Sequence, residues 1–241
     1  MSRALLVLAL TSLAAFVSLS VAVERDALGA LDRDLADWVA AELPRWAEWL
    51  ARPFSWLGGW IGLTALGTAA VIALARARAW LDLGFLVAAL LGSQLAVAVL
   101  KAGFDRPRPE VGSAVPLPDT AGFPSGHATA GAAALGALAV LAAERLPSGR
   151  ARTWLGVATV ILCIGVGLSR IALGVHFLTD VLAGWLLGLA WLAACLLARD
   201  ALRSRGARGR PGAQLPSARG RDDADPGPAP GGDRGPARLG P

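Results

Sequence analysis

The sequence has 241 residues, of which 55% are hydrophobic and only 17% are charged. A water-soluble domain of this length rarely carries so little charge, and the apolar residues stand in long uncharged blocks. The net charge of +5 does not indicate a nucleic-acid-binding protein, because much of the excess arginine lies in short loops and in the tail after Arg199. The composition therefore predicts an integral membrane protein with no nucleic-acid partner.

Six apolar segments approach the roughly 20 residues that a helix needs to cross a bilayer core. Two of them reach this length without any charge, and the other four can borrow flanking residues. The expected spans are residues 4–23, 53–75, 83–100, 128–143, 153–169 and 181–198. The predicted fold class is all-α: a bundle of six transmembrane helices whose small Gly and Ala faces allow close packing.

The first segment raises the alternative of a secretory signal, because Arg3 precedes it. Its apolar stretch is longer than the roughly 7–15 residues of a signal core, so we expect an uncleaved helix. Arginines gather after the second, fourth and sixth spans, and the positive-inside rule places these sites in the cytoplasm. We therefore expect a multi-pass plasma-membrane protein with cytoplasmic N- and C-termini. The loops expected on the extracytoplasmic side are residues 24–52, 101–126 and 170–176.

The segment 24–52, between the first two spans, is too rich in charge to cross a membrane. Leu31, Leu35 and Trp38 recur at helical spacing, with acidic residues such as Asp32 between them. This pattern predicts an amphipathic helix that lies in the extracytoplasmic interface between spans 1 and 2 and anchors the protein there.

The chain divides into a membrane domain, residues 1–200, and a tail, residues 201–241. The tail is rich in Arg, Gly and Pro and has no hydrophobic periodicity, so we expect it to be disordered in the cytoplasm. Cys163 and Cys195 both lie within expected spans, where we interpret them as small apolar side chains and not as a disulfide.

The rarest ionisable side chains gather on the expected extracytoplasmic face. Lys101 is the only lysine, and His127 and His176 are the two histidines. A charge at membrane depth costs about 2.5–3.5 kcal/mol at a helix centre, so such residues are placed for function. Arg108 and Arg170 belong to the same face and add two guanidinium groups.

These cations predict a phosphate site. The guanidinium groups of Arg108 and Arg170 can each bind two phosphate oxygens, and the ammonium of Lys101 adds a third positive charge. Ser125 is a good helix cap, and Gly126 permits close backbone approach at a helix start whose free N–H groups attract anions. We therefore expect a bound phosphate in this pocket.

The two histidines then divide the chemistry. His176 and Asp180 are four residues apart, so the carboxylate can orient the imidazole while the other ring nitrogen attacks phosphorus. His127 is placed to protonate the leaving oxygen. An alternative is a metal site formed by His127, His176 and Asp180. Three neighbouring cations would repel a divalent ion, so we expect no metal and no other cofactor.

The spacing of these residues resembles the three signatures of the type-2 phosphatidic acid phosphatase family, in the superfamily of lipid phosphate phosphatases and vanadium haloperoxidases. The matching residues are Lys101, six residues, Arg108-Pro109; Pro124-Ser125-Gly126-His127; and Ser169-Arg170, five residues, His176, three residues, Asp180. The resemblance, with its six-span plan, covers roughly residues 1–200.

The resemblance implies an enzyme that needs no metal and forms a phosphohistidine on His176. It further implies that Asp180 supports His176 and that His127 acts as the acid and then as the base for water. The implied phosphate-binding residues are Lys101, Arg108, Ser125, Gly126 and Arg170. Arg106 lies outside the signature.

The expected partner is a lipid phosphate in the membrane, and the expected reaction is hydrolysis of a phosphate or pyrophosphate ester. Candidate substrates are undecaprenyl pyrophosphate, phosphatidylglycerol phosphate and phosphatidic acid. Two alternatives stay open: a lipid phosphotransferase with the same histidine chemistry, and a non-catalytic transporter or binder of lipid headgroups.

Overall fold

The structure, a computed structural model, describes residues 2–110 and 113–208. Within these ranges every regular element is a helix, which confirms the all-α prediction. The elements are α1 (Ser2–Glu24), α2 (Gly29–Glu42), α3 (Arg45–Gly58), α4 (Trp60–Arg76), α5 (Trp80–Gly103), α6 (Gly126–Ala130), the π-helical segment η1 (Gly131–Leu135), α7 (Gly136–Ala143), α8 (Gly149–Ala172) and α9 (Leu178–Arg208).

The helix lengths and compositions fit a multi-pass membrane protein. Five helical segments are long and apolar enough to cross a membrane: α1, α5, α8, α9 and the continuous run from α6 to α7. The pair α3 and α4 passes the same test only when its two helices are taken together, and it is bent by 44°. By length and composition, the described residues thus contain five candidate spans, or six if the bent pair counts as one.

The expected span at residues 53–75 is not one continuous helix. Helix α3 begins at Arg45, before the expected start, and the extended backbone at Gly59 separates it from α4. Two adjacent glycines, Gly58 and Gly59, offer no side-chain packing to hold a helix straight, so the helix is interrupted there. The residues of the expected amphipathic helix lie in α2, and the same segment 24–52 also contains the first part of α3.

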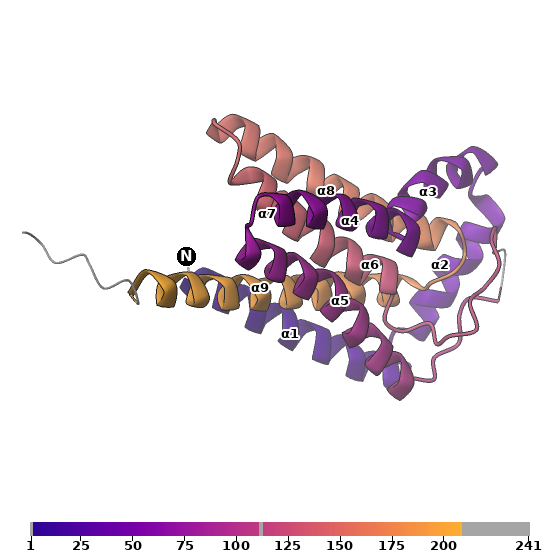
Figure 1. The fold of residues 1–241 in the computed structure, drawn as a ribbon. Helices are drawn as coiled ribbons and strands as arrows, with labels where there is room; N and C mark the ends of the chain where they lie inside the picture. Colours follow the sequence, from indigo (N-terminus) through magenta and orange to yellow (C-terminus); the bar gives the residue numbers. More distant parts are fainter. Residues whose placement is uncertain (1, 111–112, 209–241) are drawn as a thin grey trace, which may run out of the picture.

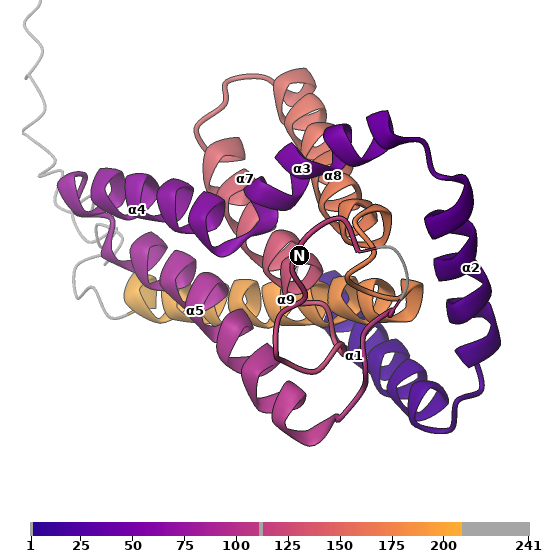
Figure 2. The ribbon, with the colours of Figure 1, turned by 90° about the vertical axis from the view of Figure 1, so that its right-hand side faces the viewer.

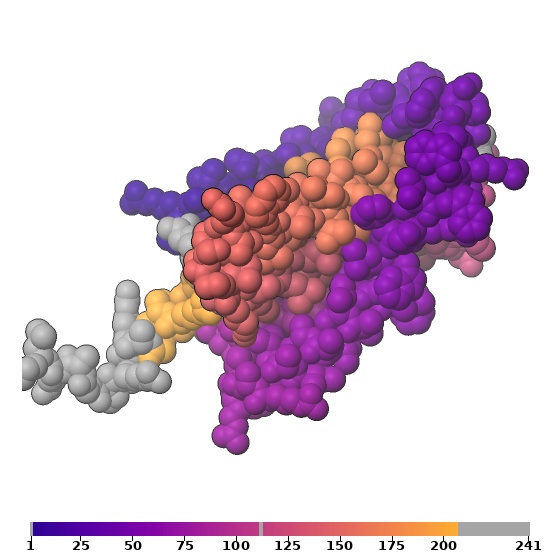
Figure 3. Space-filling model, turned by 90° about the horizontal axis from the view of Figure 1, so that it is seen from above, coloured from indigo at the N-terminus to yellow at the C-terminus, as the bar shows by residue number. Residues whose placement is uncertain are grey.

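The helices form an elongated bundle in which α9 packs against α1, α5 and α6 (Figure 1). We call one end of the bundle the site end; it carries α2, α3 and the connection from α5 to α6, and Figure 2 looks onto it. The far end carries the α4–α5 and α7–α8 connections and the last turns of α9. From above, α8 occupies the middle of the surface, between α1 and the purple to magenta residues of α4 and α5 (Figure 3).

Two glycines on α9 allow it to touch the backbone of α6. A Cβ atom on Gly184 would lie 2.7 Å from the carbonyl oxygen of Ser125, and one on Gly188 would lie 2.5 Å from that of Thr129. Any larger residue would force the helices apart. This pair of small residues, one turn apart, is a known device for close packing of membrane helices, and here it fixes the start of α6 against α9.

Buried aromatic residues anchor the long connection between α5 and α6. Phe123 is fully buried, and its ring lies 6.1 Å from that of Phe16 in α1 and 4.8 Å from that of Phe104. Aromatic pairs at these distances are favourable beyond the apolar area that they bury. The cluster holds the residues just before α6 in place.

At the far end, α9 continues beyond the apolar residues. It extends through residues 201–208, past the expected start of the tail, and Arg203 forms ion pairs with Asp82 and Glu144 at 3.1 Å. These contacts supply ordering energy that the apolar pattern did not reveal, so the expectation of disorder from residue 201 is wrong for 201–208. The rest of the expected disordered tail, residues 209–241, lies outside the described residues.

Candidate active site

A cavity of about 620 Å³ at the site end gathers the cationic and imidazole side chains that the sequence singled out. They come from the ends of two long helices, α5 and α8, from the start of α6 and from two connections. Lining this cavity are Lys101, Arg108, Gly126, His127, Arg170 and His176. Ser125 and Asp180 are fully buried behind the wall. We call this space the phosphate cavity.

Lys101 and Arg108 are held by the connection between α5 and α6. The ammonium of Lys101 donates to the carbonyl oxygen of Ala121. Arg108 donates from Nε to the carbonyl oxygen of Thr120 at 3.0 Å and from Nη1 to that of Val175 at 2.8 Å. Burial lowers the pKa of Arg108 from its ordinary value. Neutral carbonyl partners leave both positive charges uncompensated by these bonds and free to attract an anion.

Ser125 joins the beginnings of α6 and α9. Its side chain caps α6 by accepting from the backbone N–H of Ala128 at 3.5 Å, and its own N–H donates to the carbonyl oxygen of Asp180 at 3.0 Å. The predicted cap is therefore present. The first turn of α6, with Gly126 and His127, faces the cavity.

His176 lies in the short break between α8 and α9, next to Asp180. Its Nδ1 atom is 3.3 Å from Oδ2 of Asp180, and its Nε2 atom is 3.2 Å from Nη1 of Arg108. A guanidinium can only donate, so Nε2 is the acceptor and Nδ1 carries the proton toward the carboxylate. In this tautomer the Nε2 lone pair accepts from Arg108, and it becomes free only when that guanidinium turns to another acceptor.

The environment keeps His176 neutral at physiological pH. Burial lowers the pKa of this imidazole to about 4, although the hydrogen bond that its Nδ1 donates to Asp180 acts in the opposite direction. A buried site disfavours the charged form, and the nearby guanidinium of Arg108 adds to this effect. A neutral imidazole is the form that can act as a nucleophile.

Arg170 and His127 complete the opposite wall. Arg170 is buried in the last turn of α8 and donates from Nη1 to the hydroxyl of Ser55 in α3. Its Nε atom is buried and has no hydrogen-bond partner within residues 2–110 and 113–208. A phosphate oxygen would satisfy such a donor. A Cβ atom on Gly59 would lie 3.2 Å from Nε2 of His127, so the backbone at the α3–α4 break packs directly against this imidazole.

Two functional candidates escaped the sequence analysis. Asp32 of α2 is 1% exposed, whereas Leu31 beside it is 52% exposed. Asp32, expected at a polar position of the amphipathic helix, instead turns into the protein and pairs with Arg106 at 2.6 Å. Arg106 also pairs with Asp180 at 2.5 Å. A buried acidic residue normally has a cationic or hydrogen-bonding partner, but sequence spacing alone does not reveal which residues are buried.

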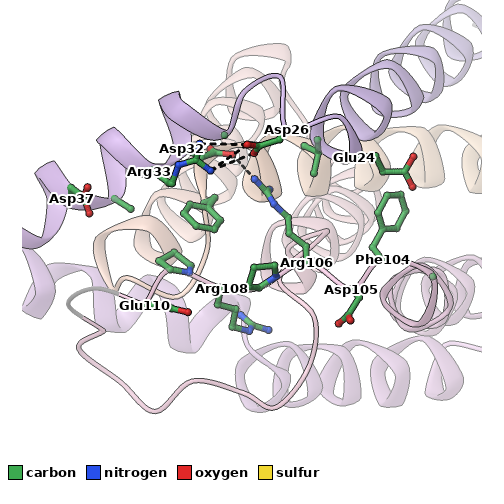
Figure 4. Close-up of a pocket in the computed structure, with 17 residues that line it drawn as sticks. Glu24, Asp26, Asp32, Arg33, Asp37, Phe104, Asp105, Arg106, Arg108 and Glu110 are labelled. Carbon is green, nitrogen blue, oxygen red and sulfur yellow. Dashed lines mark hydrogen bonds and ion pairs between the residues drawn. The ribbon is translucent and has the colours of Figure 1, made fainter.

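A second cavity, of about 550 Å³, lies on the other side of the α5–α6 connection (Figure 4). In this view the side chain of Arg106 extends toward Asp32, and Arg108 lies on the opposite side of the connection. A third space of about 350 Å³, between α4 and α5, is lined mainly by apolar residues, and Gln94 lines both this groove and the phosphate cavity.

Comparisons with known proteins give a consistent result. A family model described as the PAP2 superfamily matches residues 82–204, just over half of the chain. Phosphatidylglycerophosphatase B of Bacillus subtilis is 34% identical over 108 residues, which are 44% of this chain and 53% of that protein. Decaprenylphosphoryl-5-phosphoribose phosphatase of Mycolicibacterium smegmatis is 36% identical over 130 residues, 52% of this chain and 62% of that protein. The chain therefore matches somewhat more than half the length of these relatives.

Solved structures share the fold. The crystal structure of a transmembrane PAP2 type phosphatidylglycerolphosphate phosphatase from Bacillus subtilis superposes with a TM-score of 0.74 at 24% identity, over 84% of this chain and 98% of that one. The crystal structure of Aquifex aeolicus LpxE gives a TM-score of 0.55 at 23% identity, over 69% and 94% of the two chains. At these identities the likeness concerns the arrangement of the helices.

Proposed function

The chain belongs to the PAP2 superfamily, as its three motifs predict, and we propose that it is a lipid phosphate or pyrophosphate phosphatase that works through a phosphohistidine on His176. One observation carries the proposal: three cations and two imidazoles line a single cavity of about 620 Å³. Such a constellation suits one phosphoryl group, whose oxygens the cations neutralise while one imidazole attacks and the other transfers protons.

In the first step, the guanidinium of Arg108 turns from Nε2 of His176 to the phosphoryl oxygens, and the freed Nε2 lone pair attacks phosphorus. A P–N bond forms as the P–O bond to the lipid breaks, and the electron pair of that bond goes to the leaving oxygen. His127 gives this oxygen a proton, and Asp180 stabilises the imidazolium through Nδ1. Lys101, Arg108 and Arg170, together with the backbone at Ser125 and Gly126, hold the phosphoryl oxygens.

In the second step, water replaces the histidine. His127, now neutral, takes a proton from the water, whose oxygen attacks phosphorus. The P–N bond breaks, its electron pair returns to Nε2 of His176, and inorganic phosphate leaves. We propose that the three cations supply the charge stabilisation that a metal provides in other phosphatases, so the reaction needs no metal or other cofactor.

The proposed substrate is a lipid, because an apolar groove adjoins the phosphate cavity. This groove lies between α4 and α5 and meets the cavity at Gln94, so a chain lying in the groove can present its headgroup to the cations. The names of the two sequence relatives point to phosphatidylglycerol phosphate and to a polyprenyl-linked phosphate as the first substrates to test.

We further propose six spans, with α3 and α4 counted as one broken span, and a cavity on the extracytoplasmic side of the plasma membrane. Support comes from the arginines of the far end, which the positive-inside rule assigns to the cytoplasm. They include Arg76 and Arg78 between α4 and α5, and Arg145 between α7 and α8.

The test is phosphate release in detergent from phosphatidylglycerol phosphate, phosphatidic acid, undecaprenyl pyrophosphate and a polyprenyl phosphoribose phosphate. We expect release from at least one lipid, full activity with a chelator, inhibition by vanadate, and none of this activity in His176→Ala. Adding a candidate alcohol acceptor separates hydrolysis from phosphoryl transfer. Release from no lipid, loss of activity with chelator, or wild-type rates in His176→Ala would contradict the proposal.

A further inference from the structure

Helix α2 contributes a buried carboxylate to the wall behind His176. The guanidinium of Arg106 bridges two acidic residues there: Nη2 lies 2.6 Å from Oδ2 of Asp32, and Nη1 lies 2.5 Å from Oδ1 of Asp180. Figure 4 shows Arg106 extended from the α5–α6 connection toward α2. Asp32 does not line the phosphate cavity. Its connection to His176 therefore runs through Arg106 and Asp180.

Asp32 also holds the first turn of α9. Its Oδ1 atom accepts from the backbone N–H of Thr179 at 3.1 Å, and its Oδ2 atom accepts from the Thr179 hydroxyl at 2.5 Å. The first N–H groups of a helix have no partner within the helix, and a capping side chain normally comes from just before it. Here the cap comes from a helix far away in the sequence, and it fixes the turn that carries Asp180.

The two oxygens of Asp180 have separate partners. Oδ1 accepts from Arg106, whereas Oδ2 faces Nδ1 of His176 at 3.3 Å and accepts from the N–H of Phe177 at 2.9 Å. Arg106 therefore sets the rotation of the carboxylate so that its second oxygen points at the imidazole. The ring of Phe177, 4.9 Å from the guanidinium, supports Arg106 from one side.

The charges of this group do not cancel. Arg106 alone would neutralise Asp180, and the carboxylate would then have little charge to offer an imidazolium. Asp32 supplies a second negative charge, so the three side chains carry a net charge of minus one next to His176. Because all of them are largely buried, this charge acts with little screening by solvent.

We infer that Asp32 and Arg106 are positioning residues that orient Asp180 and preserve its negative charge for His176 during phosphoryl transfer. The inference rests on the proposed function. It goes beyond the three sequence signatures, which include neither residue. A merely structural role, in which the pair only attaches α2 to the bundle, would affect stability without changing how His176 titrates.

The primary test is Asp32→Asn, which keeps the size of the side chain and an oxygen that can accept from Thr179. It removes one negative charge and places an NH₂ group or a neutral oxygen against Arg106. We expect kcat to fall about 10- to 100-fold, by analogy with the loss seen when the hydrogen-bond partner that orients a metal-bound histidine is removed. KM should stay within about threefold, because Asp32 does not line the phosphate cavity.

The pH profile provides a readout that a structural role would not move. The charged groups facing His176 are Arg108 of the α5–α6 connection, Asp180 of α9 and Arg170 of α8, with His127 of α6 nearby. Loss of a negative charge favours the neutral imidazole, so the acid limb of kcat/KM should move to lower pH in Asp32→Asn. The substrate's own titration is the same for both proteins and cancels in the comparison.

The matched control is Asp37→Asn. Asp37 lies on the same helix and is exposed, and its substitution removes the same charge. It should leave kcat, KM and the acid limb at wild-type values, which would show that a charge on α2 matters only where it contacts Arg106. His176→Ala, assayed in parallel, tests the proposed function itself.

Arg106 supplies a second route if Asp32→Asn folds poorly. Arg106→Lys keeps the charge, but a single ammonium cannot replace the two-armed guanidinium between two carboxylates, so kcat should again fall at least about 10-fold. Arg106→Gln leaves two unpaired buried carboxylates. Adding Asp32→Asn to it should recover part of the lost kcat, a non-additivity expected of groups in one network.

The outcomes are distinguishable. Wild-type kcat and an unmoved acid limb in both Asp32→Asn and Arg106→Lys, with His176→Ala inactive, would overturn this inference and leave the proposed function intact. Full activity of His176→Ala would overturn both. Lowered melting temperatures with unchanged kcat and pH profile would assign the pair to structure alone and would also overturn the inference.

Discussion

The two ends of the helix bundle each contain an arginine bridging two carboxylates, but the surroundings of the two groups differ. At the site end, Arg106 joins Asp32 and Asp180, which are 1% and 0% exposed. At the far end, Arg199 joins Asp82 and Glu144, whose side chains are 17% and 38% exposed.

Only the site-end group touches a histidine. The far-end group instead links α5, the end of α7 and α9, and Arg203 adds a second cation to it. We therefore expect the same ion-pair chemistry to support the proposed reaction at one end and to attach helices to one another at the other. Changes at the site end should lower activity more than stability, and changes at the far end should do the opposite.

The largest effect after loss of the nucleophile is expected for His127→Asn. Removing the group that protonates the leaving oxygen should lower kcat by about 10²–10⁴-fold, with the melting temperature nearly unchanged. Steady-state kinetics and thermal melts in detergent measure both. A lipid with a more acidic leaving group should be less affected, because it needs less proton transfer. Equal losses on all leaving groups would argue against the acid role.

Gly184→Ala tests whether the site depends on the close contact of α6 and α9. The added Cβ atom would come within 2.7 Å of the Ser125 carbonyl oxygen and 2.8 Å of the Ala128 side chain, so the helices must separate. A displacement of about 1 Å between catalytic groups can cost about 10²-fold in rate. The control is Gly156→Ala in α8, where a Cβ atom meets nothing within 4 Å and kcat should not change.

At the far end, Arg199→Met should lower stability and spare the reaction. It leaves Asp82 and Glu144 without their main partner, and because both carboxylates reach solvent we expect a cost of about 1–3 kcal/mol, below that of a fully buried pair. The melting temperature in detergent should fall, whereas kcat measured well below it should match the wild type. A large loss of kcat in fully folded protein would break the contrast between the two ends.

The smallest expected effect is the pH dependence of the far-end group. Hydrogen bonds from Arg199, and more weakly from Arg203, lower the pKa of Glu144 from 4.5 to about 2. A carboxyl with a lowered pKa in the folded state stabilises the protein above pH 4.5 and loses this contribution as the pH falls toward 2. The melting-temperature difference between wild type and Glu144→Gln should therefore be largest near neutral pH and should shrink as the pH falls from 4.5 toward 2. A constant difference would contradict the shift.

The sequence was sufficient to predict the cationic and imidazole side chains that line the phosphate cavity. Lys101, His127 and His176 are the rarest ionisable side chains in an apolar chain, and their position at span ends indicated one face of the bundle. Charged groups near a membrane are retained where they have a function. Long uncharged segments likewise predicted α5, α8 and most of α9, because length and apolarity decide whether a helix can span a bilayer.

The sequence did not reveal features that depend on contacts between distant segments. Asp32 and Arg106 are far apart in the chain, and nothing in the local pattern of either residue indicates the other. The break at Gly59 was hidden because residues 53–75 are apolar on both sides of it. The extension of α9 through Arg203 depends on carboxylates contributed by other parts of the chain.

The central claim is that His176 carries the phosphoryl group. The most direct measurement is to mix the enzyme with a lipid phosphate labelled in the phosphoryl group, quench with alkali during the first turnover, and map the label by mass spectrometry. The account predicts a phosphohistidine at His176 in the wild type and no label in His176→Ala. Label on any other residue, or lipid turnover by His176→Ala at the wild-type rate, would contradict it.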